Sequence, residues 1–177
     1  MNYELKKVAD NIIDAAIKAV LPDKAVIRAL ENKEFPGRVI LVSVGKAAWQ
    51  MANAASEYLG DRIDKGIVIT KYGHVKGEIE NVTCFEAGHP VPDTNTFAAT
   101  QKVIELTEEL QADDQVLFLL SGGGSALFEK PLISTEELSD ITKQLLACGA
   151  DIVEMNTIRK RLSGYCLPSH YSNEDIA

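Results

Sequence analysis

Short, uninterrupted apolar runs constrain the fold of this chain more than any other feature. The stretch VILVSV at residues 39–44 is rich in β-branched side chains and lacks polar alternation, which is typical of a strand buried on both faces. The same kind of pattern predicts strands near residues 38–44, 66–70, 82–86 and 115–120. Strands buried in this way occur in parallel sheets that helices cover on both sides.

Helical patterns separate these runs. Apolar residues recur at helical spacing between Leu5 and Val20, and further helices are expected at residues 23–31, 46–60, 94–110, 134–149 and 151–163. Asp93 or Thr94 is suited to cap the helix that follows, and Ser134 with Glu137 has the spacing of a capping box. The alternation predicts an α/β fold with a doubly wound, mostly parallel sheet and helices on both faces.

Composition excludes several classes of protein. A chain of 177 residues that is 46% hydrophobic suits one domain with a substantial core. Its net charge of −8 argues against general binding to nucleic acid or to a membrane surface. The three cysteines are widely spaced and form no zinc motif, and the chain has neither a signal-peptide core nor a membrane-spanning run. These features predict a cytoplasmic protein with reduced thiols.

A glycine-rich loop follows the last of the predicted strands. The sequence SGGGS runs from Ser121 to Ser125, where a central strand is expected to end. Parallel sheets bind ligands beyond the carboxyl ends of their strands, and consecutive glycines let backbone amides approach an anion closely. The loop is therefore a candidate for binding an anion or a polar ligand. A purely structural tight turn is the alternative.

Basic residues follow the other predicted strands. Lys46 comes just after the first strand, Lys71 and His74 follow the second, and His89 follows the third. Each alone could be a solvated loop residue. Lys46, Lys71 and His89 are nevertheless expected at one rim of the sheet together with the glycine loop. This arrangement favours a site for a small anionic or phosphorylated substrate.

Common catalytic motifs do not account for this pattern. Leu127 stands where a dinucleotide fingerprint needs its third glycine, and it also breaks the nucleophile-elbow pattern. Ser43 and Lys46 have S-x-x-K spacing, but Ser43 falls within a predicted strand and no SDN or KTG motif follows. Ala47 and Ile40 occupy positions that exclude a P-loop.

Five motifs resemble, in order and spacing, the N-terminal domain of the class II glycerate 2-kinases, the MOFRL-type family. They are SVGKAAWQMANAA, GIVITKYGH, EAGHPVPDTNT, LFLLSGGGSALFEKP and MNTIRKRLS. Members of this family have often been labelled hydroxypyruvate reductase, a name that does not suit a chain without a dinucleotide fingerprint. The resemblance implies a Rossmann-like fold and ATP- and Mg²⁺-dependent phosphorylation of D-glycerate at its 2-hydroxyl. The product would be 2-phosphoglycerate, formed in a cleft between this domain and a smaller C-terminal domain.

The resemblance also implies roles for individual residues. Lys46 matches the family's catalytic lysine, and with Arg159 it would neutralise charge on the transferred phosphoryl group. No residue of the chain is expected to ligate a metal. The expected substrate- or phosphate-binding residues are Ser121, Gly122, Gly123, Gly124, Ser125, Lys71, His89, Asp93, Asn156 and Lys160.

The chain departs from the family pattern after residue 163. Where family members continue with a glycine-rich segment containing lysine, this chain reads GYCLPSHYSNEDIA. Residues 1–163 are therefore expected to form a partial N-terminal glycerate kinase domain, and residues 164–177 a disordered tail. Three hypotheses stay open: a kinase fragment that is inactive without a C-terminal half, an anion-binding module without turnover, and a structural fragment. Apolar surface left uncovered by a missing domain also predicts a homo-oligomer.

Overall fold

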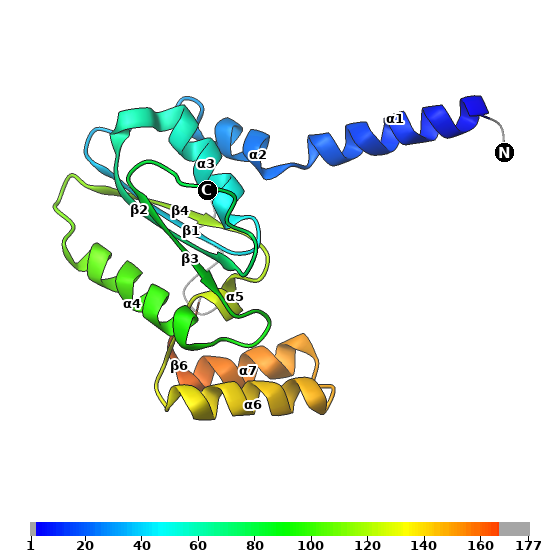
Figure 1. The fold of residues 1–177 in the computed structure, drawn as a ribbon. Helices are drawn as coiled ribbons and strands as arrows, with labels where there is room; N and C mark the ends of the chain where they lie inside the picture. The colour runs from blue at the N-terminus through cyan, green and yellow to red at the C-terminus, as the bar shows by residue number, and fades with distance from the viewer. Residues whose placement is uncertain (1–2, 167–177) are drawn as a thin grey trace.

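A four-stranded parallel sheet forms the centre of the computed structural model, which describes residues 3–166 (Figure 1). Its strands are β1 (Val39–Val44), β2 (Ile63–Lys71), β3 (Val82–Ala87) and β4 (Gln115–Leu120), in the order β3-β2-β1-β4. All neighbouring strands pair in parallel. The structure thus confirms the predicted α/β fold, including all four expected strands of the sheet. It corrects one expectation, because β4, the strand before the glycine loop, lies at the edge of the sheet and not at its centre.

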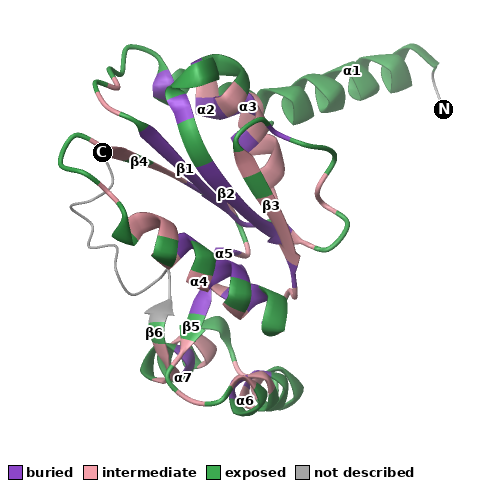
Figure 2. Cartoon of the chain, turned by 60° about the vertical axis from the view of Figure 1, so that its left-hand side comes forward, coloured by how far each residue is buried: buried purple, intermediate pink, exposed green. Residues whose placement is uncertain are grey.

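Helices cover both faces of this sheet. Helices α2 (Pro22–Leu30) and α3 (Ala48–Leu59) pack on one face, while α4 (Thr94–Glu108) and the short α5 (Gly124–Leu127) pack on the other (Figure 2). A short 3-10 turn, η1 (Gly60–Arg62), leads from α3 into β2. Every residue of β1 is buried because its side chains alternate between two hydrophobic clusters, one on each face. The unbroken apolar run in the sequence reflects this double burial.

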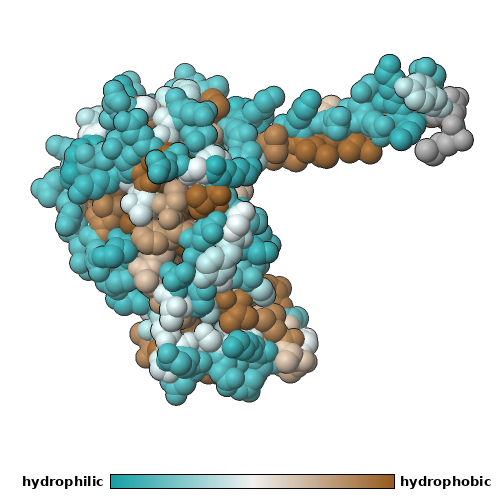
Figure 3. Space-filling view, viewed as in Figure 1, coloured by the Kyte–Doolittle hydropathy of each residue, from teal (hydrophilic) through white to brown (hydrophobic). Residues whose placement is uncertain are grey.

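Helix α1 (Tyr3–Ala19) extends away from the sheet (Figure 1). It forms where the helical pattern predicts it, yet none of its residues is buried. Its apolar side chains line up along one side in the space-filling view (Figure 3). Neither α1 nor any other helix in residues 3–166 has the length and apolar character that a membrane crossing requires.

A pair of helices, α6 (Thr135–Ala147) and α7 (Ile152–Leu162), follows the glycine loop and lies beside α4 and α5 (Figures 1 and 2). The predicted capping box of Ser134 and Glu137 is present at the start of α6, and Asp151 forms another with Glu154 at the start of α7. In the chain, β5 (Glu129–Pro131) precedes the two helices and β6 (Ser163–Cys166) follows them, and these two strands pair as a small antiparallel ribbon.

The ribbon changes where the expected C-terminal tail begins. Residues 164–166 were expected to begin a disordered tail, but they belong to β6, which pairs with β5. A strand of three or four residues is too short to show an alternating pattern in the sequence. Residues 167–177, the rest of the expected tail, lie outside the described part of the chain.

Strand β2 begins earlier than its apolar run. Ile63 is buried and already pairs with β1, whereas Asp64 and Lys65 are exposed and interrupt the hydrophobic pattern. Asp64 forms an ion pair with Arg38, and Lys65 forms one with Glu109. These polar residues therefore explain why the hydrophobic pattern did not predict the first residues of β2.

Candidate functional site

The carboxyl ends of β1 and β4 meet at the point where the chain reverses its direction across the sheet. The chain moves from β1 outward to β2 and β3 and then returns to place β4 on the other side of β1. Such a switch point is where open α/β sheets bind ligands. Lys46 follows β1 here, and its amide donates a hydrogen bond of 3.0 Å to the carbonyl of Gly122, which follows β4.

The turn after β1 depends on a glycine. Gly45 has a φ of +122°, and a Cβ at this position would lie 2.2 Å from Ser121 Oγ. With glycine in place, Ser121 Oγ accepts a 3.0 Å hydrogen bond from the amide of Ala47, and Thr70 donates one of 2.9 Å to the carbonyl of Gly45. Three strand ends are thereby tied together, which fixes the backbone on which Lys46 stands.

The glycine loop brings Lys46 and His89 together. Gly123 has a φ of +91°, and a Cβ on it would lie 2.8 Å from His89 Nε2 and 3.2 Å from Lys46 Cε. Gly122 faces open space, with no atom within 4 Å of its Cβ position. In the described part of the chain, neither the Gly122 amide nor the Gly123 amide donates a hydrogen bond to another residue. Both amides are therefore available to an anion beside a lysine and an imidazole.

Positive charge surrounds the half-buried imidazole of His89. Burial lowers the pKa of His89 below its ordinary value of 6.5, and the charges of Lys46, Lys71 and Arg159 lower it further. His89 is consequently neutral near pH 7. Lys46, Lys71 and His89, here called the cationic rim, thus lie close enough for both lysines to act on the imidazole, and their role in ligand binding stays a prediction.

The loop after β2 supports this rim. His74 Nδ1 lies 2.9 Å from the carbonyl oxygen of Lys46, within hydrogen-bonding distance. The carboxylate of Glu86 accepts hydrogen bonds of 2.9 Å from the amides of His74 and Val75. Backbone hydrogen bonds from Val75 and Gly73 lower the pKa of Glu86. His74 therefore links the turn after β2 to Lys46.

Asp93 is engaged in structural contacts. As expected it is the N-cap of α4, accepting a hydrogen bond of 3.0 Å from the Thr96 amide in a reciprocal capping box. Its second oxygen accepts a 2.6 Å hydrogen bond from the hydroxyl of Tyr72. Burial raises the pKa of Asp93, but the hydrogen bonds from Tyr72, Thr96 and Gly88 outweigh it and lower the pKa overall. The ligand-binding role expected for Asp93 thus competes with contacts that already occupy its carboxylate.

The residues expected on the last helix reach the site to different extents. Arg159 is buried, forms an ion pair with Glu129, and donates a 2.7 Å hydrogen bond to the carbonyl of Ser125 in the glycine loop. Asn156 is half-buried and Lys160 is exposed on α7. Among residues 3–166, no side-chain hydrogen bond or ion pair joins Asn156 or Lys160 to the glycine loop or to the cationic rim. The structure therefore joins Arg159 to the loop through Ser125 and leaves the other two apart.

Three supporting residues stand within the quoted motifs, but the motif analysis assigned them no role: Thr70, Tyr72 and Glu129. Glu129 carried no clear signal of burial, because the charged Lys130 follows it directly. Thr70 and Tyr72 act through backbone and loop contacts that no local pattern indicates.

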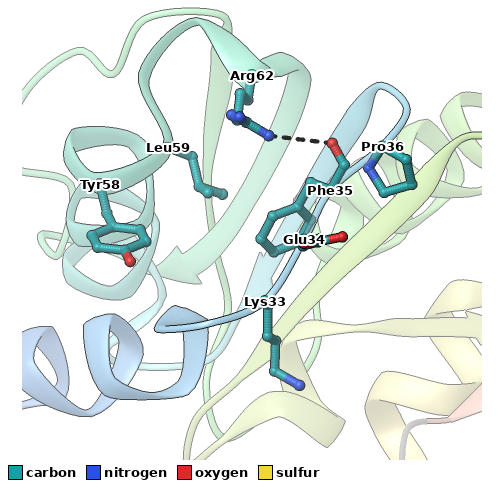
Figure 4. A pocket seen from close by; sticks show the side chains of 7 residues that line it. All are labelled: Lys33, Glu34, Phe35, Pro36, Tyr58, Leu59 and Arg62. Atoms are coloured by element: carbon teal, nitrogen blue, oxygen red, sulfur yellow. Dashed lines mark hydrogen bonds between the residues drawn. The ribbon is translucent and has the colours of Figure 1, made fainter.

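A separate hollow lies at the opposite edge of the sheet. It has a volume of about 520 Å³ and is lined by Phe35 and Pro36 before β1, by Arg62 before β2, and by Tyr58 and Leu59 at the end of α3 (Figure 4). Arg62 donates a 3.3 Å hydrogen bond to the carbonyl of Phe35 across it. Because it precedes the strands, the hollow is distinct from the site around Lys46.

Comparison with known proteins identifies relatives along most of this chain. The D-glycerate 2-kinase of Thermotoga maritima is 55% identical over 161 residues, which cover 90% of this chain and 38% of that protein. The glycerate 2-kinase of Pyrococcus horikoshii is 37% identical over 173 residues, covering 90% of this chain and 39% of that protein. The chain thus spans less than two fifths of the length of these relatives.

The fold is also similar to that of a solved glycerate kinase. The crystal structure of glycerate kinase from Thermotoga maritima matches with a TM-score of 0.82 at 54% identity, covering 92% of this chain and 39% of that one. The family model described as "Domain of unknown function (DUF4147)" matches residues 8–165. Since this match includes every strand of the sheet, the glycine loop and α7, the chain belongs to the DUF4147 family.

Proposed function

We propose that this chain forms the part of a glycerate 2-kinase site that holds the anionic groups of D-glycerate and ATP. The observation that carries the proposal is the meeting of Lys46, His89 and Gly123 at the switch point of the sheet. Relatives that are 55% and 37% identical over 90% of this chain are named glycerate 2-kinases, which supports this substrate class. We place the activity in the cytoplasm.

The cationic rim suits phosphoryl transfer. In this reaction the 2-hydroxyl oxygen of D-glycerate attacks the γ-phosphorus of ATP, and the bond to the β–γ bridging oxygen breaks, giving 2-phosphoglycerate and ADP. The transferred group carries charge on its outer oxygens, so catalysis depends on positioned cations and N–H donors. Lys46 would supply a mobile cation, and the Gly122 and Gly123 amides would hold a carboxylate or phosphate oxygen.

His89 has properties that suit the hydroxyl of the acceptor. Its imidazole is neutral because burial and neighbouring cations lower its pKa. A neutral imidazole can accept a hydrogen bond or a proton from a hydroxyl group. We propose that His89 contacts the 2-hydroxyl group of D-glycerate and that Lys71 adds positive charge around the site. Arg159 contributes charge from behind the loop, because its guanidinium is already bonded to Glu129 and Ser125.

The described residues do not by themselves form a metal site. Residues 3–166 contain no cluster of three or more His, Cys, Asp or Glu side chains suited to a metal ion. The carboxylates near the rim, Glu86 and Asp93, accept hydrogen bonds from backbone amides and Tyr72. Mg²⁺ commonly reaches kinases through the phosphates of its nucleotide and keeps several waters, so no step is assigned to a metal held by this segment.

We further propose that residues 1–177 alone bind without turnover. The relatives are more than twice as long as the segment matched here, and phosphoryl transfer requires donor and acceptor to be held in line and shielded from water. A single wall of the site can supply charge and amides but cannot enclose both substrates. Binding is therefore the property that this chain is expected to retain.

The proposal is tested by calorimetric titration of residues 1–177 with D-glycerate, together with a coupled assay for ADP release. Saturable binding is expected in the wild type, and Lys46→Ala should weaken it by about tenfold or more, the usual loss when a charge-assisted contact is removed. Lys65→Ala is the matched control, because Lys65 lies at the start of β2 on an exposed surface. Absence of saturable binding would contradict the site. Release of ADP that requires D-glycerate and is lost in Lys46→Ala would contradict the absence of turnover.

One observation favours a second function. The apolar side of α1 is exposed along its length, which suits a segment that associates with another chain. On this alternative the chain is an anion-binding or structural module that self-associates, and the anion site serves binding alone.

A further inference from the structure

A buried ion pair lies directly behind the glycine loop. Glu129, the first residue of β5, is fully buried, and Arg159 on α7 is 4% exposed. Arg159 Nη2 contacts Glu129 Oε2 and also donates a 2.7 Å hydrogen bond to the carbonyl of Ser125. One guanidinium therefore connects a carboxylate of the ribbon to the backbone of the loop.

The backbone of Glu129 is held by hydrogen bonds of its own. The backbone amide of Glu129 donates a 3.0 Å hydrogen bond to Thr100 Oγ1, and that hydroxyl in turn donates a 2.8 Å bond to the carbonyl of Thr96. Both threonines are buried on α4, the helix that Asp93 caps. Glu129 is thus anchored to α4, and its carboxylate can hold the Arg159 guanidinium in one place.

The two charged groups depend on each other. Within the described residues, Glu129 Oε1 and Arg159 Nε are buried and have no hydrogen-bond partner. Burial raises the pKa of Glu129, and the Arg159 guanidinium, with Ser163, opposes that rise. A buried ion that loses its only charged partner is strongly disfavoured, so removal of the carboxylate would release Arg159 from its place against Ser125.

The same guanidinium acts on the site. The charge of Arg159 contributes to the low pKa of His89, which lies against Gly123 of the same loop. A change in the position or net charge of the pair therefore reaches both the loop backbone and the imidazole.

We propose that Glu129 is a positioning residue for the glycine loop: it holds the Arg159 guanidinium against the Ser125 carbonyl and thereby sets the geometry of the Gly122–Ser125 backbone. This inference rests on the proposed function for its ligand, but its structural part can be measured without one. Glu129 touches no substrate in this scheme, because it is fully buried.

The test compares Glu129→Gln with the wild type in three measurements on the whole chain. D-glycerate binding should weaken by about tenfold or more, the scale expected when a supporting contact moves a binding group. Amide hydrogen exchange at Ala126 and Phe128, whose amides donate hydrogen bonds to the carbonyls of Gly123 and Gly124, should become faster. The pKa of His89, followed by NMR, should rise toward its ordinary value because the charge of the released Arg159 no longer lies beside the loop. If the single variant does not fold, the double variant Glu129→Gln, Arg159→Gln removes both buried charges and is tested in its place.

Two controls separate positioning from general stability. Glu105→Gln removes an equal charge from an exposed ion pair on α4, and Leu30→Ala destabilises the core on the opposite face of the sheet. Neither should change loop exchange or binding. If Leu30→Ala weakens binding as much as Glu129→Gln, or if Glu129→Gln leaves loop exchange and binding unchanged, the proposal is overturned. If the wild type does not bind D-glycerate, the proposed function fails alone, and loop exchange with the His89 titration still decides the role of Glu129.

Discussion

Two adjacent glycines in the loop differ sharply in what their positions tolerate. Gly123 has a positive φ, and its Cβ position is crowded by His89 and Lys46, whereas Gly122 faces open space. Gly123→Ala should therefore lower the free energy of unfolding by about 1–3 kcal/mol, the usual cost of a strained left-handed residue. Gly122→Ala should change it by less than about 0.5 kcal/mol.

Chemical denaturation of the two variants measures this difference. The same pair separates folding from function, because a methyl group on Gly122 would enter the space offered to a ligand. Gly122→Ala should fold normally and bind D-glycerate less well. Equal stability of the two variants would show that the loop does not hold Gly123 in the left-handed region.

The imidazole of His89 reports on the charges around it. Burial and the charges of Lys46, Lys71 and Arg159 all lower its pKa. Lys46→Met removes one cation and keeps a long side chain, so the pKa of His89 should rise toward 6.5 but stay below it, because burial persists. An NMR titration of the ring signals follows this, with Lys65→Met as the control that leaves the pKa unchanged. A pKa of His89 that does not respond to Lys46→Met would place the two side chains apart in solution.

At the scale of the element, the N-cap of α4 links helix stability to acid. Asp93 caps the helix and accepts the Tyr72 hydroxyl, and its pKa is lowered below the ordinary 3.8. Asp93→Ala should lower the free energy of unfolding by about 1–2 kcal/mol at neutral pH. A carboxyl whose folded pKa is lowered stabilises the fold above its unfolded pKa, and that contribution is lost as pH falls through the folded value.

Urea denaturation across a pH series tests this linkage. The difference in the free energy of unfolding between wild type and Asp93→Ala should be full near pH 7 and should shrink below pH 3.8. Leu30→Ala removes a buried apolar side chain, which does not titrate, and should give a difference that is independent of pH. A constant difference for Asp93→Ala would mean that the charge of its carboxylate contributes nothing.

Long elements with a clear apolar pattern were predictable from the sequence, whereas short strands and polar strand ends were not. The strands β1 and β4 follow from unbroken apolar runs, and the helices α1, α4 and α6 follow from apolar periodicity and caps. The β5–β6 ribbon escaped prediction because its strands are held by pairing between residues more than thirty positions apart. The first residues of β2 escaped because Asp64 and Lys65 point to solvent.

The site was predictable in outline for a related reason. Parallel strands must end at one edge, so the residues that follow them, such as Lys46 and His89, had to gather there. The contacts of Arg159 and Asp93 were not predictable, since a sequence motif does not show whether a charged group faces a ligand or an internal partner. Arg159 pairs with Glu129 and Asp93 accepts a hydrogen bond from Tyr72, and both partners lie in distant parts of the sequence.

At the scale of the whole molecule, α1 has an apolar face that no other part of the described chain covers. Its apolar residues have the spacing of a face meant for burial. Each of these side chains is more than half exposed: Leu5, Val8, Ile12, Ile13, Ile17 and Val20. Each such side chain would gain about 1.5–3 kcal/mol on full burial, so an isolated α1 is costly to leave in water.

We predict that residues 1–177 self-associate through α1, with a second copy covering this face. A pairing of identical helices about a two-fold axis closes without leaving a free surface, which favours a dimer. Ile12→Asp places a charge in the middle of the apolar side and should yield a monomer, as measured by light scattering after gel filtration. Asn11→Asp adds the same charge at the neighbouring position on the polar side and should remain associated. A wild-type chain that stays monomeric at high concentration would contradict the pairing. It would leave α1 as a surface for the region that the longer glycerate kinases possess beyond the matched segment.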